Sequence, residues 1–98
     1  MLQGYLQLNT NAQLQKYLQE LTILCVDDAR SIREAYKHIL AQYFKEVYLA
    51  ADGMEALEVF DRHGPDLVLT DYLMPHMDGL SLIKQIRQKD RSVPVILV

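Results

Sequence analysis

Short apolar runs alternate along the chain with segments in which apolar residues recur at helical spacing. The runs lie at residues 21–26, 46–50, 66–71 and 94–98. Nearly continuous apolar runs of this length are typical of strands buried on both faces of a parallel sheet. The alternation predicts right-handed strand–helix–strand units, and therefore an α/β fold with a doubly wound parallel sheet and helices on both faces.

Three helices are expected between these strands. Ser31 with Glu34, and Asp52 with Glu55, resemble capping boxes at the start of the first two. Gly64-Pro65 is a strong stop signal for the second. Leu57 and Phe60 give the inner face of the second helix, and the third helix carries Leu80, Leu82, Ile83 and Ile86. The apolar residues that recur at helical spacing in the first are Ile32, Ala35, Tyr36, Ile39, Leu40 and Tyr43.

Three aspartates follow two of the predicted strands. Asp27 and Asp28 come directly after the first strand, and Asp71 ends the third. In open parallel sheets, ligands sit beyond the carboxyl ends of the strands, so we expect these three side chains to lie together. Each alone has a simpler interpretation: a helix cap for Asp28, a solvated loop charge for Asp27 and a turn cap for Asp71. Only their convergence favours a shared site.

Three adjacent carboxylates repel one another unless a cation neutralises them. A small hard cation such as Mg²⁺ (or Mn²⁺) prefers oxygen ligands of this kind. A metal held there would neutralise charge on a transferring phosphoryl group. An aspartate carboxylate is a competent nucleophile that gives an acyl phosphate. The cluster therefore predicts phosphoryl transfer onto a carboxylate.

Composition narrows the function classes. The chain has 98 residues, which allows one small domain at most. A net charge of −3 with no basic stripe argues against nucleic-acid binding by this segment. The apolar runs are too short to span a bilayer, so we expect no membrane insertion. The one cysteine, Cys25, cannot form an internal disulfide and fits a cytoplasmic protein, with a role as a small core residue.

Four segments resemble response-regulator receiver domains. Residues 23–28 look like the family's first strand and acidic pair, and residues 51–57 resemble its "A-x-[DN]-G-x-E-A-L" segment. Residues 69–79 are similar to the phosphoacceptor strand and loop almost position for position, and residues 93–98 resemble the fourth strand. The resemblance implies a flavodoxin-like receiver fold with strand order 2-1-3-4-5.

Carried over residue by residue, the resemblance implies that Asp71 is the phosphoacceptor. Asp28 would bind Mg²⁺ directly, Asp27 would act mainly through a metal-bound water, and the backbone carbonyl of Leu73 would be a further ligand. The phosphodonor would be a sensor histidine kinase or a phosphotransfer protein. The implied function is that of a two-component signalling module, not an enzyme beyond its own metal-assisted phosphorylation and dephosphorylation.

The sequence also departs from the family. Its switching mechanism uses a Ser or Thr at the end of strand four and a Lys at the end of strand five, and the chain ends at Val98 before either. Lys84 and Lys89 lie on the predicted third helix and are poor substitutes. We therefore expect a receiver domain over 21–98 that lacks its last part and is impaired in switching. A bare apolar fourth strand also predicts a homodimer or a swapped oligomer.

Residues 1–20 form a leader with more than one interpretation. Residues 4–8 resemble, faintly, a fifth strand that would complete the sheet in this chain or in a neighbour. In the helix that follows, Leu14, Tyr17, Leu18 and Leu21 share one face. Two other interpretations of the leader are that it is the tail of a preceding domain, or that it is a polar connecting helix.

Two other functions compete with the signalling module. A degenerate receiver would act as a protein-interaction or dimerisation module in which the acidic site is a relic. An aspartate-nucleophile phosphatase would need a second Asp two residues after the nucleophile as general acid. Leu73 occupies that position, so turnover of external phosphoesters is not expected.

Overall fold

Four parallel strands form the centre of the molecule, in a computed structural model that describes residues 12–98. Their order is β2-β1-β3-β4, which confirms the expected doubly wound sheet up to its fourth strand. The described residues contain no fifth strand. The strands are β1 (Thr22–Val26), β2 (Glu46–Ala50), β3 (Leu67–Thr70) and β4 (Val95–Leu97).

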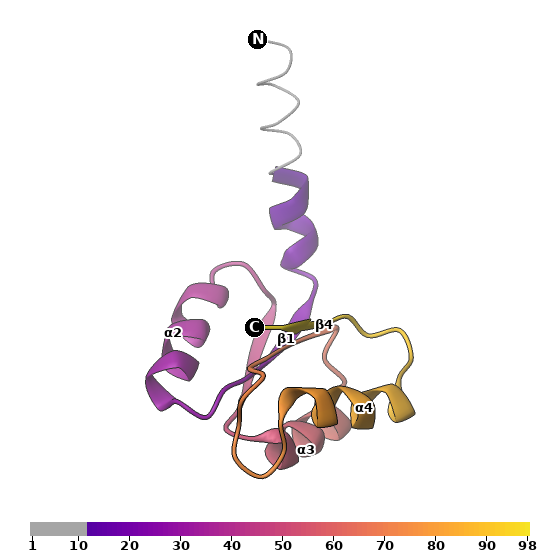
Figure 1. Ribbon diagram of the computed structural model, residues 1–98. Coiled ribbons are helices and arrows are strands. Elements are labelled where there is room, and N and C mark those ends of the chain that lie inside the picture. Colours follow the sequence, from indigo (N-terminus) through magenta and orange to yellow (C-terminus); the bar gives the residue numbers. More distant parts are fainter. Residues whose placement is uncertain (1–11) are drawn as a thin grey trace.

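Helices cover the two faces of this sheet unequally (Figure 1). One face carries α2 (Arg30–Leu40), and the other carries α3 (Gly53–His63) and α4 (Gly79–Lys89). Successive residues of a strand point to opposite faces. In β1, Leu24 and Val26 therefore pack with α3 and α4, whereas Ile23 and Cys25 face α2.

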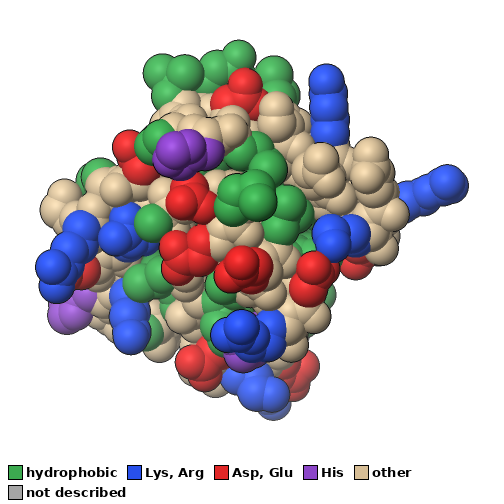
Figure 2. All heavy atoms as spheres, turned by 90° about the horizontal axis from the view of Figure 1, so that it is seen from below, with side chains coloured by type: hydrophobic (Ala, Val, Ile, Leu, Met, Phe, Trp, Pro, Cys, Tyr) green, Lys and Arg blue, Asp and Glu red, His purple; other side chains and the backbone are tan. Residues whose placement is uncertain are grey.

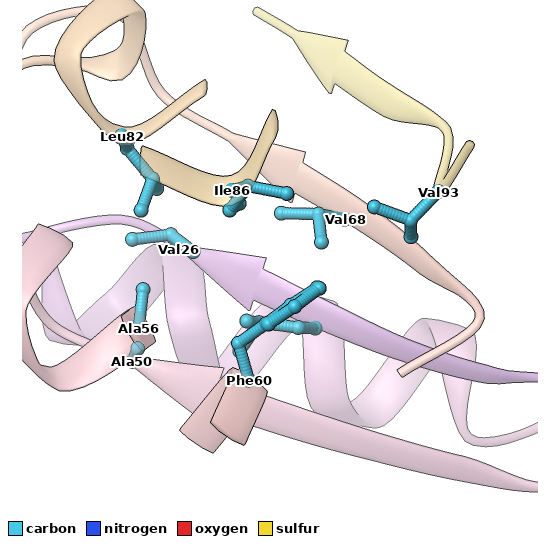
Figure 3. Close-up of a cluster of buried hydrophobic side chains, with 9 residues drawn as sticks. Val26, Ala50, Ala56, Phe60, Val68, Leu82, Ile86 and Val93 are labelled. Atoms are coloured by element: carbon cyan, nitrogen blue, oxygen red, sulfur yellow. The ribbon is translucent and has the colours of Figure 1, made fainter. Parts of the chain in front are cut away.

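The main core fills the space between the sheet and the pair α3 and α4 (Figure 3). Leu82 and Ile86 of α4 have 0% of their surface exposed, so both lie on the inner face of this helix, whereas Leu80 is exposed. Leu57 of α3 packs against the same cluster. The cluster comprises Leu24, Val26, Ala50, Ala56, Phe60, Val68, Leu82, Ile86 and Val93.

The apolar residues that recur at helical spacing along α2 are at most half-buried. No residue of α2 is buried, and Ile39 is 53% exposed. Ile32, and Tyr43 just beyond the helix, are also exposed. Among the described strands, α2 packs against β1 and β2, which form only half of the sheet. Its apolar stripe is therefore wider than the surface with which the described residues cover it.

The first predicted capping box is also wrong. The N-cap of α2 is Ala29, which has no side chain able to cap, and Ser31 already lies inside the helix. Glu34 accepts instead from Arg30 at 3.0 Å, as an exposed pair one turn apart. Glu34 therefore forms an ion pair on the helix surface and does not cap the start of α2.

The second capping box and the stop signal are confirmed. Asp52 caps α3 by accepting from the Glu55 N–H at 2.8 Å, and the Glu55 carboxylate accepts from the Ala51 N–H at 3.1 Å. Gly64 ends α3 with φ 56° and ψ 58°. This left-handed conformation costs glycine little because glycine has no Cβ.

The leader is described only from residue 12. Residues 12–18 are helical and project away from the sheet (Figure 1). Leu14 and Tyr17 are exposed, so the described part of this apolar face is largely uncovered. The strand expected at 4–8 lies outside the described residues. None of the helices in 12–98 is long and apolar enough to cross a membrane.

Candidate functional site

The strand register places the predicted acidic residues at one edge of the sheet. β1 and β3 pair in parallel, with Val26 opposite Thr70. The pairing continues one residue further, because the Asp71 N–H donates to the Val26 carbonyl at 3.0 Å. On the other side, the Asp27 N–H donates to the Ala50 carbonyl at 3.1 Å. The backbones of both acids are therefore fixed by the sheet itself.

The three aspartates form one cluster, as the sequence predicted. One carboxylate oxygen from each of Asp27, Asp28 and Asp71 lies within 4.8 Å of the others. Asp27 is buried, with 7% of its surface exposed, while Asp71 is half-buried and Asp28 exposed. Figure 2, which views the molecule from below, shows acidic side chains gathered near the centre of this face. The cluster is therefore reachable from solvent at an open surface.

The cluster has the donor set of a hard-cation site. The ion pairs among the described residues join Arg30 to Glu34 and Lys89 to Asp61, and none involves the three aspartates. Their mutual repulsion is therefore not relieved by a bonded side-chain cation. Carboxylate oxygens in this arrangement suit Mg²⁺, which keeps several water ligands and needs few from the protein.

Asp27 is held by groups that follow it in the chain. Its Oδ1 accepts from the Ala29 N–H at 2.9 Å, and its backbone carbonyl accepts from Arg33 Nη1 at 2.9 Å. The sequence interpretation did not identify Arg33. No motif could have indicated it, because its partner is a backbone carbonyl that every residue type carries.

Burial raises the pKa of two ionisable groups near the site. Burial raises the pKa of the Tyr36 hydroxyl, and the negative charges of Asp27 and Asp71 raise it further. Burial also raises the pKa of the Cys25 thiol to about 12. Because the thiolate is the reactive form, Cys25 is inert at neutral pH, in agreement with its expected role as a core residue.

The loop after Asp71 is packed tightly against α4. A Cβ at Gly79 would lie 2.6 Å from the Asp71 carbonyl oxygen and 2.6 Å from Leu97 Cδ1, so only glycine fits there. The Gly79 N–H donates to the Tyr72 carbonyl at 2.8 Å. Leu73, two residues after Asp71, is 73% exposed. The role of its backbone carbonyl as a metal ligand stays a prediction.

Comparison with known proteins identifies the family. Residues 23–98 match the family described as "Response regulator receiver domain". The chain belongs to this family. Receiver domains are modules of two-component signalling rather than enzymes in their own right, as the sequence resemblance implied.

Individual relatives and structures agree with this receiver assignment. The chain is 38% identical over 78 residues to the response regulator MprA of Mycobacterium leprae, covering 80% of this chain and 34% of that protein. It is 40% identical over 81 residues to the probable transcriptional regulator ycf27 of Porphyridium aerugineum, covering 83% of this chain and 33% of that protein. The chain thus spans about a third of the length of these curated relatives.

A solved receiver structure shares the fold. The chemotaxis response regulator CheY4 of Vibrio cholerae superposes with a TM-score of 0.74 at 33% identity, covering 80% of this chain and 67% of that chain. The sheet order β2-β1-β3-β4 is that of a flavodoxin-like receiver up to its fourth strand. The acidic cluster lies where a doubly wound fold binds ligands, beyond the carboxyl ends of its central strands.

Proposed function

We propose that this receiver domain accepts a phosphoryl group on Asp71 from a sensor histidine kinase or a phosphotransfer protein. The observation that carries the proposal is the convergence of three carboxylates, from the ends of β1 and β3, within 4.8 Å of one another. Asp71 is the candidate nucleophile because it is half-buried, and so both oriented by the fold and open to a donor.

The metal ligands we propose are Asp27, Asp28, Asp71 and the backbone carbonyl of Leu73. Asp28 and Asp71 would bind Mg²⁺ directly, and the buried Asp27 would act mainly through a metal-bound water. Mn²⁺ offers the same preference for oxygen donors. When bound, the cation would supply charge neutralisation for the transferring phosphoryl group.

The transfer itself is carried out by the Asp71 carboxylate. One carboxylate oxygen attacks the phosphorus of a phosphohistidine, and the P–N bond breaks as the electron pair leaves with the imidazole. The product is an aspartyl phosphate, which water later hydrolyses, releasing inorganic phosphate and restoring the Asp71 carboxylate. Asp27 and Asp28 would lie beside the new phosphoryl group at the open end of the sheet.

A small phosphodonor tests this function without knowledge of the kinase. The protein is incubated with acetyl phosphate and Mg²⁺ and weighed by intact mass spectrometry. We expect one added phosphoryl group in the wild type, none after Asp71→Asn, and none when EDTA removes the metal. Asp61→Asn is the matched control, because Asp61 is an exposed aspartate on α3 that pairs with Lys89 outside the cluster.

The same experiment distinguishes this function from the alternative, a protein-interaction module. Absence of an adduct in the wild type would favour an interaction module in which the acidic cluster no longer receives phosphate. An adduct that persists in Asp71→Asn would show that another residue is the acceptor.

A further inference from the structure

We propose that Arg33 is a positioning residue for the metal site, because it fixes the backbone of Asp27 while leaving the three carboxylates to the cation. The inference rests on the proposed metal-assisted function. It assigns a task to a side chain of α2 that neither the acidic motif nor the sheet register identifies.

Three hydrogen bonds hold Asp27. Its N–H donates to the Ala50 carbonyl at 3.1 Å, and its Oδ1 accepts from the Ala29 N–H at 2.9 Å. Arg33 supplies the third, from Nη1 to the Asp27 carbonyl at 2.9 Å. The first bond comes from the sheet and the other two from the start of α2. Together they define the orientation of the Asp27 carboxylate, and within 12–98 no group donates to its second oxygen.

Arg33 bonds to a backbone carbonyl and not to a carboxylate, and this affects the charge around the acidic cluster. A guanidinium bonded to the carboxylates would compete with a cation for the same oxygens. Arg33 makes no ion pair within 4.0 Å of a carboxylate among the described residues, so it brings a positive charge beside Asp27 without occupying a ligand atom. An arginine suits this position because it stays charged at any physiological pH.

Two simpler roles for Arg33 predict different effects on Mg²⁺ affinity. If Arg33 only linked α2 to the sheet, its removal would lower stability and leave Mg²⁺ affinity unchanged. If it were only a nearby positive charge, its removal would strengthen Mg²⁺ binding, because repulsion between the guanidinium and the cation would vanish. A positioning role predicts weaker binding despite the loss of that repulsion.

Arg33→Gln and Arg33→Lys are the test variants. Arg30→Gln is the matched control, since it removes the same charge from the same helix at a side chain that pairs with Glu34 instead. Mg²⁺ is titrated into the full chain and followed by the ¹⁵N–¹H shifts of Asp28 and Ala29. The free energy of unfolding in EDTA is measured for each variant by urea denaturation.

We expect Arg33→Gln to weaken Mg²⁺ binding about tenfold, the size found when groups that orient metal ligands are removed. The Ala29 amide shift should change in the metal-free variant, because Asp27 Oδ1 loses its fixed orientation. Arg33→Lys should restore part of the affinity, since lysine keeps the charge and a donor. Arg30→Gln should bind as the wild type does.

Three outcomes would overturn the assignment. These are unchanged or tighter Mg²⁺ binding by Arg33→Gln, an equal loss in Arg30→Gln, and unfolding of both Arg33 variants in EDTA, which would show a structural link only. Failure of the underlying function is distinguishable, because there the wild type itself would bind no Mg²⁺ at the cluster.

Discussion

The two faces of the sheet differ in how completely the described residues cover them. On one face, α3 and α4 bury Ala56, Leu82 and Ile86 with no exposed surface. On the other, α2 is strongly amphipathic in sequence, yet none of its residues is buried. The difference shows that helical periodicity identifies the face that can be buried. Whether it is buried depends on how much partner surface the fold provides.

The acidic cluster draws on both faces. Asp71 is held on the α4 side, where Gly79 packs against its carbonyl. Asp27 is held on the α2 side, through Ala29 and Arg33. One half of the site is therefore supported by the well-packed core, and the other half by hydrogen bonds from a helix with little buried surface.

The test with the largest expected effect compares the truncation of one side chain on each face of the sheet. Leu82→Ala should lower the free energy of unfolding by about 3 kcal/mol, since it removes a fully buried side chain and leaves a cavity. Ile39→Ala, at a residue 53% exposed, should cost less than about 1 kcal/mol. Urea denaturation of both variants gives the comparison. Equal losses would mean that the α2 face is as well packed as the other.

A second test compares the helix starts. Asp52→Ala removes the capping bond to the Glu55 N–H and should cost about 1 kcal/mol. Ser31→Ala should leave stability nearly unchanged, because Ser31 makes no capping bond at α2. Thermal unfolding followed by circular dichroism measures both. A clear loss in Ser31→Ala would restore the capping box that the structure does not show.

The third test, which has the smallest expected effect, measures the reactivity of the native cysteine. Cys25 is fully buried on the α2 face, and its pKa of about 12 keeps it protonated at neutral pH. It should therefore react with a thiol reagent only when the protein opens. Because α2 contributes little burial, we expect labelling through local opening at a lower free energy than global unfolding.

The control for this labelling lies on the opposite face. Cys25→Ser combined with Val68→Cys places the only thiol at a fully buried position in the main core. That thiol should label only at the rate of global unfolding, measured by denaturant dependence. Equal protection of the two thiols would show that both faces open together.

Much of the fold and the cluster followed from the sequence. The second strand lies at the predicted residues, and the other three differ at their ends by one or two residues. Asp27, Asp28 and Asp71 converge because parallel strands place their carboxyl ends at one edge, a rule that needs only the strand assignments.

The departures from the sequence interpretation have different physical causes. Burial of the apolar residues of α2 depends on the tertiary surface that the strands offer. The capping box at Ser31 and the contact of Arg33 were decided by nearby residues of the same segment. Ser31 and Glu34 fit a capping pattern, but Arg30 took Glu34 as an ion-pair partner instead. Arg33 bonds to a carbonyl, which leaves no trace in residue identity. Local sequence reports what a segment is able to do, and the surrounding chain decides between the options.

Gly79 lies where the start of α4 meets Asp71 and Leu97 without room for a side chain. The missing Cβ lets the first turn of α4 rest directly on the Asp71 carbonyl and on Leu97, with no room to absorb a shift. A side chain at position 79 would therefore have to displace both the backbone of Asp71, which carries the acidic site, and Leu97 of the outermost strand.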